Sequence, residues 1–304
     1  MRNQGSANST ATDWLDENGQ QMDEDHRGLV YDIRTLIDRR RALGIFSGVA
    51  LTSLLSACGV ISETDASASP SSTSTATPTA TPSASASASA SASASTRLTE
   101  VPDETGGPYP ADGSNGINVL DDSGIVRSDI RASFGASTTV AAGVPLTIAL
   151  TVREAATGAA LAGRGVYLWH CDRDGNYSLY SGGVENENYL RGVQQTDANG
   201  TVRFTSIYPA CYSGRWPHIH FEIYDHVATA VTSGPIVKTS QIALPDEANA
   251  AVYATSGYEQ SIRNASQVSL ARDNVFGEDG GIHQIATMSG SVSQGYTASL
   301  TIGV

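Results

Sequence analysis

Two histidines separated by one residue stand close to a tyrosine and an arginine in the stretch PACYSGRWPHIHFEIYD, residues 209–225. On a β-strand, side chains at positions i and i+2 point to the same side, so His218 and His220 would present two imidazoles on one face. Such a pair is a recurrent half-site for zinc, copper, iron or nickel. The pair alone leaves a second interpretation open, in which one histidine is a hydrogen-bonded core residue and the other is exposed.

Two tyrosines favour a metal site. Tyr212 precedes the histidines across the bend SGRWP, which can fold the phenol back toward the imidazoles, and Arg215 lies within that bend. Tyr177 follows a turn in WHCDRDGNY, after a strand that can pair near the same edge. A phenol with a reference pKa of about 10 can bind a trivalent ion in its ionised form, because the ion lowers the pKa of its ligands. A phenolate is a hard anion, so the Tyr/His set indicates iron(III) rather than zinc.

The segments that would carry these residues are predicted strands. They are short, rich in Val, Ile, Thr and aromatic residues, separated by Gly, Asn, Asp and Pro, and lie at 144–154, 165–172, 200–209, 218–225, 236–244 and 296–304. Asn199-Gly200 predicts a tight turn, in which Asp197 forms an Asx-turn. One helix is predicted over 245–254, whose first turn is acidic. The spacing favours an all-β, antiparallel sandwich, with loops through 255–295.

The first third of the chain is typical of an export signal and a tether. Residues 1–58 are predicted to be an N-terminal extension and a lipoprotein or export signal, because Arg39–Arg41 precede an apolar run and the string LSAC, in which Cys58 would be lipidated. Residues 59–97, dominated by Ser, Ala, Thr and Pro, are predicted to be a disordered linker. These features predict an exported protein, either a cell-surface lipoprotein joined to the membrane only through Cys58 or an extracellular one. Met1 or Met22 as the start, and Tat or Sec export, remain open.

Charge and cysteine content narrow the class of protein further. The net charge of −13 and the pI near 4.7 argue against nucleic acid as a partner. The remaining residues, 98–304, are enough for one domain with a sizeable core. They contain Cys171 and Cys211, and an even pair in an exported protein predicts a disulfide, with two buried free thiols as the alternative. A bridge would join the segments that carry Tyr177 and Tyr212.

The combined pattern resembles the intradiol ring-cleavage dioxygenases, in particular their secreted actinobacterial members. The resemblance covers most of 98–304 and rests on TGGPYP (105–110), WHCDRDGNYS (169–178), ENYLRGVQQTDANGTVRFTSIYPACYSGRWPHIHF (187–221) and IVKTSQIAL (236–244). It implies an immunoglobulin-like or prealbumin-like β-sandwich with long loops. It also implies a non-haem iron(III) centre with two tyrosine and two histidine ligands.

Position by position, the resemblance implies roles for particular residues. The implied iron ligands are Tyr177, Tyr212, His218 and His220. Of the tyrosines, Tyr177 would stay bound throughout turnover and Tyr212 would be displaced when substrate chelates the metal. Arg215 falls at the arginine that stabilises developing negative charge, and Gln241 at a polar residue of the same pocket, so the implied catalytic residues are Arg215, Gln241 and Tyr212. One departure is Trp216-Pro217, where the family usually has Pro-Ala.

The implied reaction is the cleavage of a catechol-type aromatic by O2 to a cis,cis-muconate-type product, with a small diphenol and O2 as the reacting partners and the oligomeric state left open. Two other functions stay open. One is a non-catalytic, surface-displayed module that binds a metal, an aromatic compound or a carbohydrate. The other is a zinc or copper enzyme that uses only His218 and His220. His170 and His283 could bind metal but match no ligand position of the family, and Tyr109 could either approach the pocket or close a turn.

Overall fold

The computed structural model describes residues 97–304. The predicted export signal, the lipidation site Cys58 and all but the last residue of the predicted linker lie outside this range. Within it, no helix has the length and hydrophobicity that crossing a bilayer requires.

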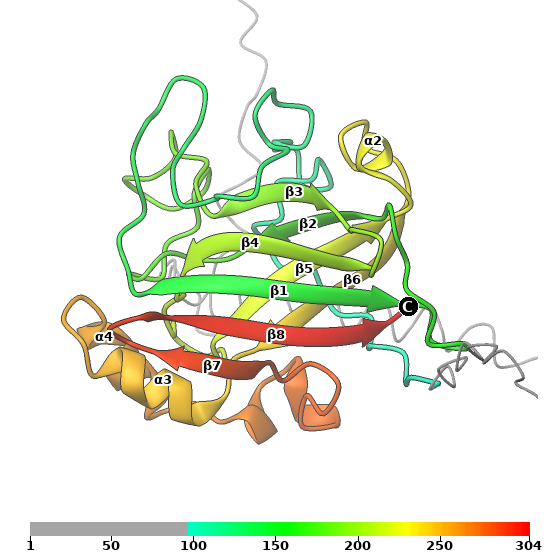
Figure 1. The fold of residues 1–304 in the computed structure, drawn as a ribbon. Helices are drawn as coiled ribbons and strands as arrows, with labels where there is room; N and C mark the ends of the chain where they lie inside the picture. Colours follow the sequence, from blue (N-terminus) through cyan, green and yellow to red (C-terminus); the bar gives the residue numbers. More distant parts are fainter. Residues whose placement is uncertain (1–96) are drawn as a thin grey trace, which may run out of the picture. The chain divides into compact units, whose positions relative to one another are not determined.

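The described part of the chain is built mainly from two four-stranded sheets, with the orders β4-β1-β8-β7 and β3-β2-β5-β6 (Figure 1). The strands are β1 (Pro145–Arg153), β2 (Gly165–Trp169), β3 (Arg191–Gln195), β4 (Thr201–Ile207), β5 (His218–Tyr224), β6 (Ile236–Ala243), β7 (Thr287–Ser291) and β8 (Gly295–Gly303). Each of the predicted strand segments coincides with one of these strands to within a few residues. The prediction of an all-β domain is therefore confirmed.

One expectation about strand direction is wrong. The spacing of the strands favoured an antiparallel sandwich, and the other strand pairs are antiparallel, but β1 and β8 are parallel, with Leu146 beside Tyr296 and Val152 beside Ile302. Parallel neighbours need a long connection. Here the chain supplies it by passing through the second sheet and the helices before it returns to the first sheet with the hairpin β7–β8. The period-2 pattern of a strand indicates which of its residues face the core. It does not indicate which other strand pairs with it in the sheet.

The two sheets share one hydrophobic core. Alternate residues of β1 and β4, such as Ile148 and Phe204, meet alternate residues of β2 and β5, such as Leu168 and Phe221. All of β5 is buried because its other face is covered as well. Since Ile219, Phe221 and Ile223 face the core, the residues between them lie on the opposite face of the second sheet, where the candidate site forms.

An extended N-terminal segment, residues 98–110, is fastened to the second sheet. Lys238 of β6 is buried and forms ion pairs with Glu100 at 2.7 Å and Asp103 at 3.0 Å. Further along, the Gln241 side-chain amide donates to the Thr105 carbonyl at 2.9 Å. These contacts bring Tyr109 to the face of the sheet that carries the histidines.

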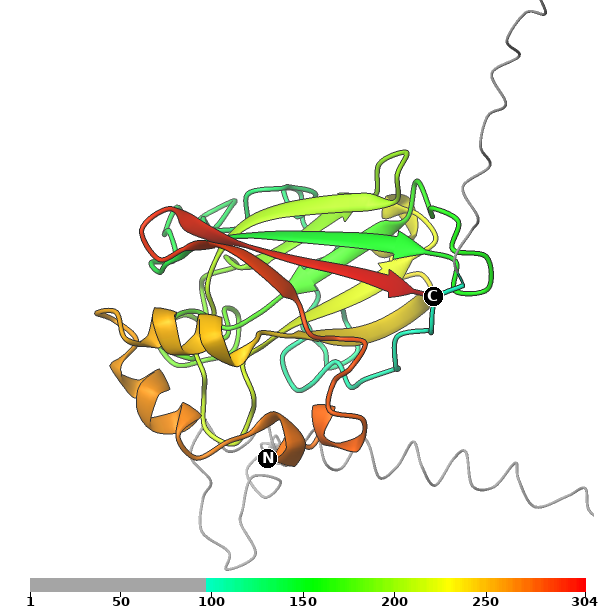
Figure 2. The same cartoon turned by 60° about the horizontal axis from the view of Figure 1, so that its bottom comes forward.

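Five short helical elements connect the strands: α2 (Val227–Ala230), α3 (Asp246–Tyr253), α4 (Glu259–Ala265), and the 3-10 helices η1 (Leu270–Arg272) and η2 (Phe276–Glu278). The helix predicted over 245–254 is confirmed as α3, which begins directly after Pro245 and adds Ala248 and Val252 to the core. Figure 2 shows α3 and α4 on one side of the two sheets. The region 255–295 thus holds α4 and β7 as well as the expected loops.

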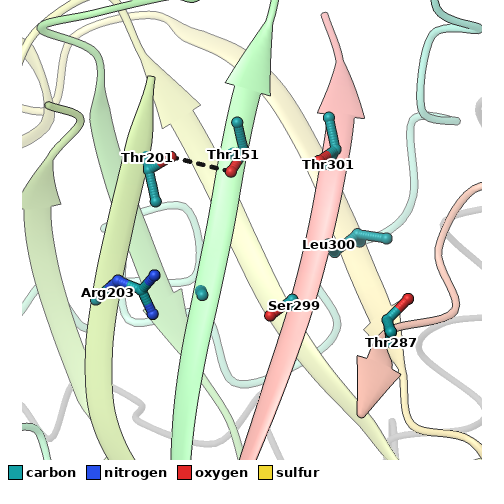
Figure 3. A pocket seen from close by; sticks show the side chains of 8 residues that line it. Thr151, Thr201, Arg203, Thr287, Ser299, Leu300 and Thr301 are labelled. Atoms are coloured by element: carbon teal, nitrogen blue, oxygen red, sulfur yellow. Dashed lines mark hydrogen bonds between the residues drawn. The ribbon is translucent and has the colours of Figure 1, made fainter. Parts of the chain in front are cut away.

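A shallow groove of about 390 Å³ lies on the outer face of the first sheet (Figure 3). Its lining is Ala149, Thr151, Thr201, Arg203, Thr287, Ser299, Leu300 and Thr301, with the Thr151 and Thr201 hydroxyls 3.0 Å apart. None of the residues predicted to act on a substrate or a metal lines this groove. The hydrophobic core separates it from the face that carries His218 and His220.

Candidate metal centre

Two phenol oxygens and two imidazole nitrogens converge on one point of the second sheet. The hydroxyl oxygen of Tyr177 lies 3.5 Å from Nε2 of His218 and 3.3 Å from Nε2 of His220. The hydroxyl oxygen of Tyr212 lies 3.1 Å from Nε2 of His218, and the two Nε2 atoms are 3.1 Å apart. The structure therefore brings together the four side chains that the resemblance implies as iron ligands.

Strand pairing positions the two histidines. His220 of β5 lies between Trp169 of β2 and Gln241 of β6. The Trp169 indole stacks on the His220 imidazole with the ring centroids 4.9 Å apart and the planes 6° from parallel. Nδ1 of His218 lies 2.6 Å from the Trp216 carbonyl, to which it can only donate. Because this bond places the proton on Nδ1, the lone pair of neutral His218 is on Nε2 and faces the cluster.

Hydrogen bonds to the backbone near each tyrosine position the two phenols. In the turn before Tyr177, the Asp172 carboxylate accepts from the amides of Asp174 and Asn176, both at 2.9 Å. Helix α4 holds the residue before Tyr212, because Ser261 accepts from the Cys211 amide at 3.1 Å and the Asn264 side chain donates to the Cys211 carbonyl at 2.9 Å. The helix that positions Tyr212 was not predicted.

The cluster has the features of a metal site. Burial lowers the pKa of His218 and His220 well below the usual value, so both imidazoles are neutral, as metal ligands must be. Burial also raises the pKa of Tyr177 well above its usual value, so without a nearby cation this phenol keeps its proton. The donor atoms are separated by 3.1–3.5 Å, as are atoms that surround one ion at about 2 Å. The residues present therefore fit a metal ion that accepts nitrogen and phenolate oxygen.

The donor set also argues against an ordinary zinc site. Zinc sites in proteins are built from Cys, His, Asp and Glu. Within residues 97–304, no group of three or more such side chains is arranged around a common point.

A buried arginine lies beside the cluster. The Arg215 side chain is completely buried, and its Nε atom donates to Asp273 at 3.0 Å. Its Nη2 atom donates to the side-chain oxygen of Gln241 at 2.7 Å. The structure thus joins the two predicted polar residues, Arg215 and Gln241, to each other. Asp273 was not singled out in the sequence, because no local pattern in the loop-rich region pointed to it.

A second carboxyl group belongs to the same charged cluster. Glu104 is buried, and burial raises its pKa to about 7, against the opposing effect of the positive charge of Arg215. Asp273 and Asp279 add to the increase. Arg215 is therefore hydrogen-bonded to Asp273, and the pKa of about 7 places the second carboxyl, Glu104, close to its point of half-protonation near neutral pH. The motif TGGPYP drew attention to the residues after Glu104, but not to Glu104 itself.

The predicted disulfide is wrong. Cys171 and Cys211 are both free and buried. Each thiol instead faces backbone oxygens, Cys171 that of Ala210 at 3.7 Å and Cys211 that of Arg215 at 3.5 Å. Burial raises the pKa of both thiols, that of Cys211 to about 12, so neither is a reactive thiolate.

Of the remaining residues considered in the sequence, one contacts the cluster and the others have different surroundings. The Tyr109 ring packs against Tyr177 with the centroids 4.9 Å apart, so it reaches the site. The ring nitrogens of His170 both have other partners, the Cys171 carbonyl and the Ser206 hydroxyl at 2.7 Å each. His283 is not among the residues that meet at the cluster. Asp197 forms the predicted Asx-turn by accepting from the Asn199 and Thr201 amides.

Comparisons with known proteins show that the part of the chain that carries this cluster is similar to dioxygenases. The model of a family described as Dioxygenase matches residues 131–233, a range that contains both tyrosines, Arg215 and both histidines of the cluster. An intradiol ring-cleavage dioxygenase from Tetranychus urticae is 25% identical, with a TM-score of 0.50, over 60% of this chain and 87% of that one. The resemblance to intradiol ring-cleavage dioxygenases is confirmed.

Two further solved structures are similar to this chain. A second dioxygenase is 24% identical with a TM-score of 0.50, over 60% of this chain and 87% of that one. The dioxygenase domain of a dioxygenase–carbohydrate-binding fusion from Streptomyces sp. SirexAA-E is 21% identical with a TM-score of 0.43, over 68% of this chain and 98% of that one. No curated protein sequence matches this chain significantly.

Proposed function

We propose that this chain is an iron(III)-dependent intradiol dioxygenase, which cleaves a catechol-type aromatic with O2 to a cis,cis-muconate-type product. The observation that carries the proposal is the convergence of the Tyr177 and Tyr212 oxygens with Nε2 of His218 and His220, at 3.1–3.5 Å. Two phenols and two neutral imidazoles suit a hard trivalent cation. The resemblance to intradiol dioxygenases supports the same ion and the same class of substrate.

In this proposal the two tyrosines have different tasks. Bound iron(III) supplies the positive charge that lets a catechol bind as a dianion and that makes its ring reactive toward O2. Tyr177 is 2% exposed and stays in place, whereas Tyr212 is 9% exposed and leaves when the substrate enters. On leaving, the Tyr212 oxygen would accept one of the two catechol protons, and the second proton would pass to water.

Arg215 and Gln241 act on the substrate side of the site. The Arg215 guanidinium is held by Asp273 and Gln241 in a region without water contact, so its charge is preorganised where negative charge develops. Gln241 neighbours His220 across the strands and contacts Arg215, so it links the metal ligands to the arginine. Trp169 covers one face of His220 and excludes water from it.

The proposal extends to the rest of the molecule. We propose that residues 98–304 form the catalytic domain and that its two sheets are an immunoglobulin-like sandwich. We further propose that residues 1–58 direct export and carry a lipid at Cys58, and that residues 59–97 are the linker. The product would then form outside the cytoplasm, which suits an aromatic substrate taken from the environment.

The reaction is tested with purified protein loaded with Fe(III), a panel of catechols, and 18O2. The expected result is O2 uptake in a one-to-one ratio with loss of a catechol, and a ring-opened diacid that contains two 18O atoms. Arg215→Met is the matched variant and should retain the iron while it loses turnover. An iron-loaded protein that binds catechols and consumes no O2 with any of them would instead be a binding module.

A further inference from the structure

Arg191, the first residue of β3, forms several hydrogen bonds near the candidate metal centre. Its side chain is 1% exposed. Nε donates to the Ser178 hydroxyl at 3.0 Å and Nη2 to the Ser178 carbonyl at 2.9 Å. Nη1 contacts the carbonyls of Tyr109 at 2.9 Å and Pro110 at 3.1 Å, and the Tyr167 hydroxyl at 3.2 Å. The guanidinium thus ties three other segments of the chain to β3.

The bonded segments include Ser178, which follows Tyr177 in the chain, and Tyr109, whose ring packs against the Tyr177 ring. Ser178 follows Tyr177 directly, so the two bonds to Ser178 fix the backbone from which the Tyr177 side chain extends. The bond to the Tyr109 carbonyl holds the residue whose ring packs 4.9 Å from the Tyr177 ring. Arg191 therefore restrains Tyr177 from the backbone and, through Tyr109, from the ring face.

The partners of Arg191 are all neutral. Within residues 97–304, no ion pair joins Arg191 to a carboxylate, whereas Arg215 is paired with Asp273. A buried charge without a counter-ion is expensive, and such charges occur where they serve a partner that is itself charged. The guanidinium lies beside the cluster, since two of its bonds go to Ser178, the residue directly after Tyr177. Anionic ligands of the metal centre are the missing counter-charge.

We propose that Arg191 is a positioning residue for the metal centre, which fixes Tyr177 and supplies uncompensated positive charge to its phenolate and to an anionic substrate. This inference rests on the proposed function and adds a residue to it. Two properties of Arg191 are then separable. Its fork of donors sets the geometry of Tyr177, and its charge sets the electrostatic potential at the site.

The test compares Arg191→Met, Arg191→Lys and Arg127→Met. Lysine keeps the charge but has three donors on one nitrogen, so it cannot reproduce the planar fork. Arg127 is a matched control, because it also uses its guanidinium to bind backbone carbonyls, those of Ala132, Asn188 and Arg191, but it contacts neither Ser178 nor Tyr109. The first readout is made on the metal-free proteins labelled with 3-fluorotyrosine, in which the Tyr177 resonance is assigned with Tyr177→Phe.

The expected pattern distinguishes geometry from charge. The fluorine resonance of Tyr177 should move in both Arg191 variants and stay in place in Arg127→Met. With Fe(III) bound, Arg191→Met should bind the metal about 10–100-fold more weakly. The reduction potential of iron in Arg191→Met should be lower, because a positive charge near the site is gone. Arg191→Lys should keep the potential of the parent protein while it loses affinity.

Two results would overturn the proposal: an unmoved Tyr177 resonance in folded Arg191→Lys, or equal iron affinities and potentials in all three variants. If the proposed iron-dependent function is wrong, the experiment gives a different result. A parent protein that develops no visible absorption with Fe(III) would remove the iron assignment, while the resonance of the metal-free protein would still decide whether Arg191 positions Tyr177.

Discussion

The buried ion pair between Arg215 and Asp273 predicts a large effect of Asp273→Asn on stability. Both side chains are 0% exposed, and the pair is 3.0 Å long. Asp273 also accepts from the Trp216 amide at 2.7 Å and from the Val275 and Phe276 amides at 2.9 and 3.1 Å. The carboxylate therefore balances the charge of Arg215 and accepts hydrogen bonds from the backbone amides at the start of η2.

The expected loss follows from what the variant leaves behind. The asparagine oxygen can still accept from backbone amides, so those bonds are weakened rather than removed. The charge of Arg215, however, would remain in the core beside Glu104, whose pKa of about 7 makes it only a partial substitute. Removal of one partner from a buried pair costs about 3–5 kcal/mol, so we expect a loss in that range at pH 7.

The assay is urea denaturation of metal-free protein, with Asp129→Asn as the matched control. Asp129 pairs with Arg131 at 2.7 Å, but the two side chains are 51% and 42% exposed. Exposed pairs contribute about 0–1 kcal/mol, so this control should unfold close to the parent protein. Equal losses in the two variants would refute the view that Arg215 depends on Asp273 for its charge balance.

Three further outcomes are expected. Burial raises the pKa of Glu222 to about 8 from the ordinary 4.5, so the folded protein holds this proton more tightly than the unfolded chain. Stability should therefore decline between about pH 4.5 and 8, by at most about 5 kcal/mol, and Glu222→Gln should flatten the decline; an unchanged slope would contradict this. Alkylation of unfolded protein without reductant should label Cys171 and Cys211, and a disulfide-linked peptide would contradict the structure. Gln241→Ala removes an acceptor of Arg215 and should raise KM for a catechol several-fold with iron affinity unchanged; weaker iron binding would mean that Gln241 supports the metal instead.

Much of the fold was predictable, because the strands that face the core carry strong period-2 patterns. The segment 218–225 is a clear case, in which the alternation of His and Ile places the imidazoles opposite the core. Strand β7 was missed because its sequence, TMSGS, contains glycine and small polar residues and is mostly exposed. The parallel pairing of β1 with β8 was missed because pairing partners depend on the path of the whole chain.

The candidate site was predictable where its residues are close in sequence and belong to a recognisable motif. Tyr212, Arg215, His218 and His220 lie within nine positions, so one bend and one strand bring them together. The supporting groups come from distant segments and include Asp273, Glu104 and the α4 residues that hold Cys211. Each is an ordinary polar residue in its local sequence, and only tertiary structure gives it a role. The cysteine pair was misjudged for the same reason, since composition reports the number of thiols and not their partners.

The most direct measurement is the visible absorption spectrum of metal-free protein titrated with Fe(III). We expect a tyrosinate-to-iron absorption band that saturates at one equivalent, changes in Tyr212→Phe and is lost or strongly altered in Tyr177→Phe, because the two phenol oxygens lie within 3.5 Å of the ligand histidine nitrogens. Asn115→Ala, which changes the neighbourhood of Tyr180 and not that of the two phenols, should leave the band in place. A protein that stays colourless with Fe(III) and binds zinc instead would contradict the iron centre.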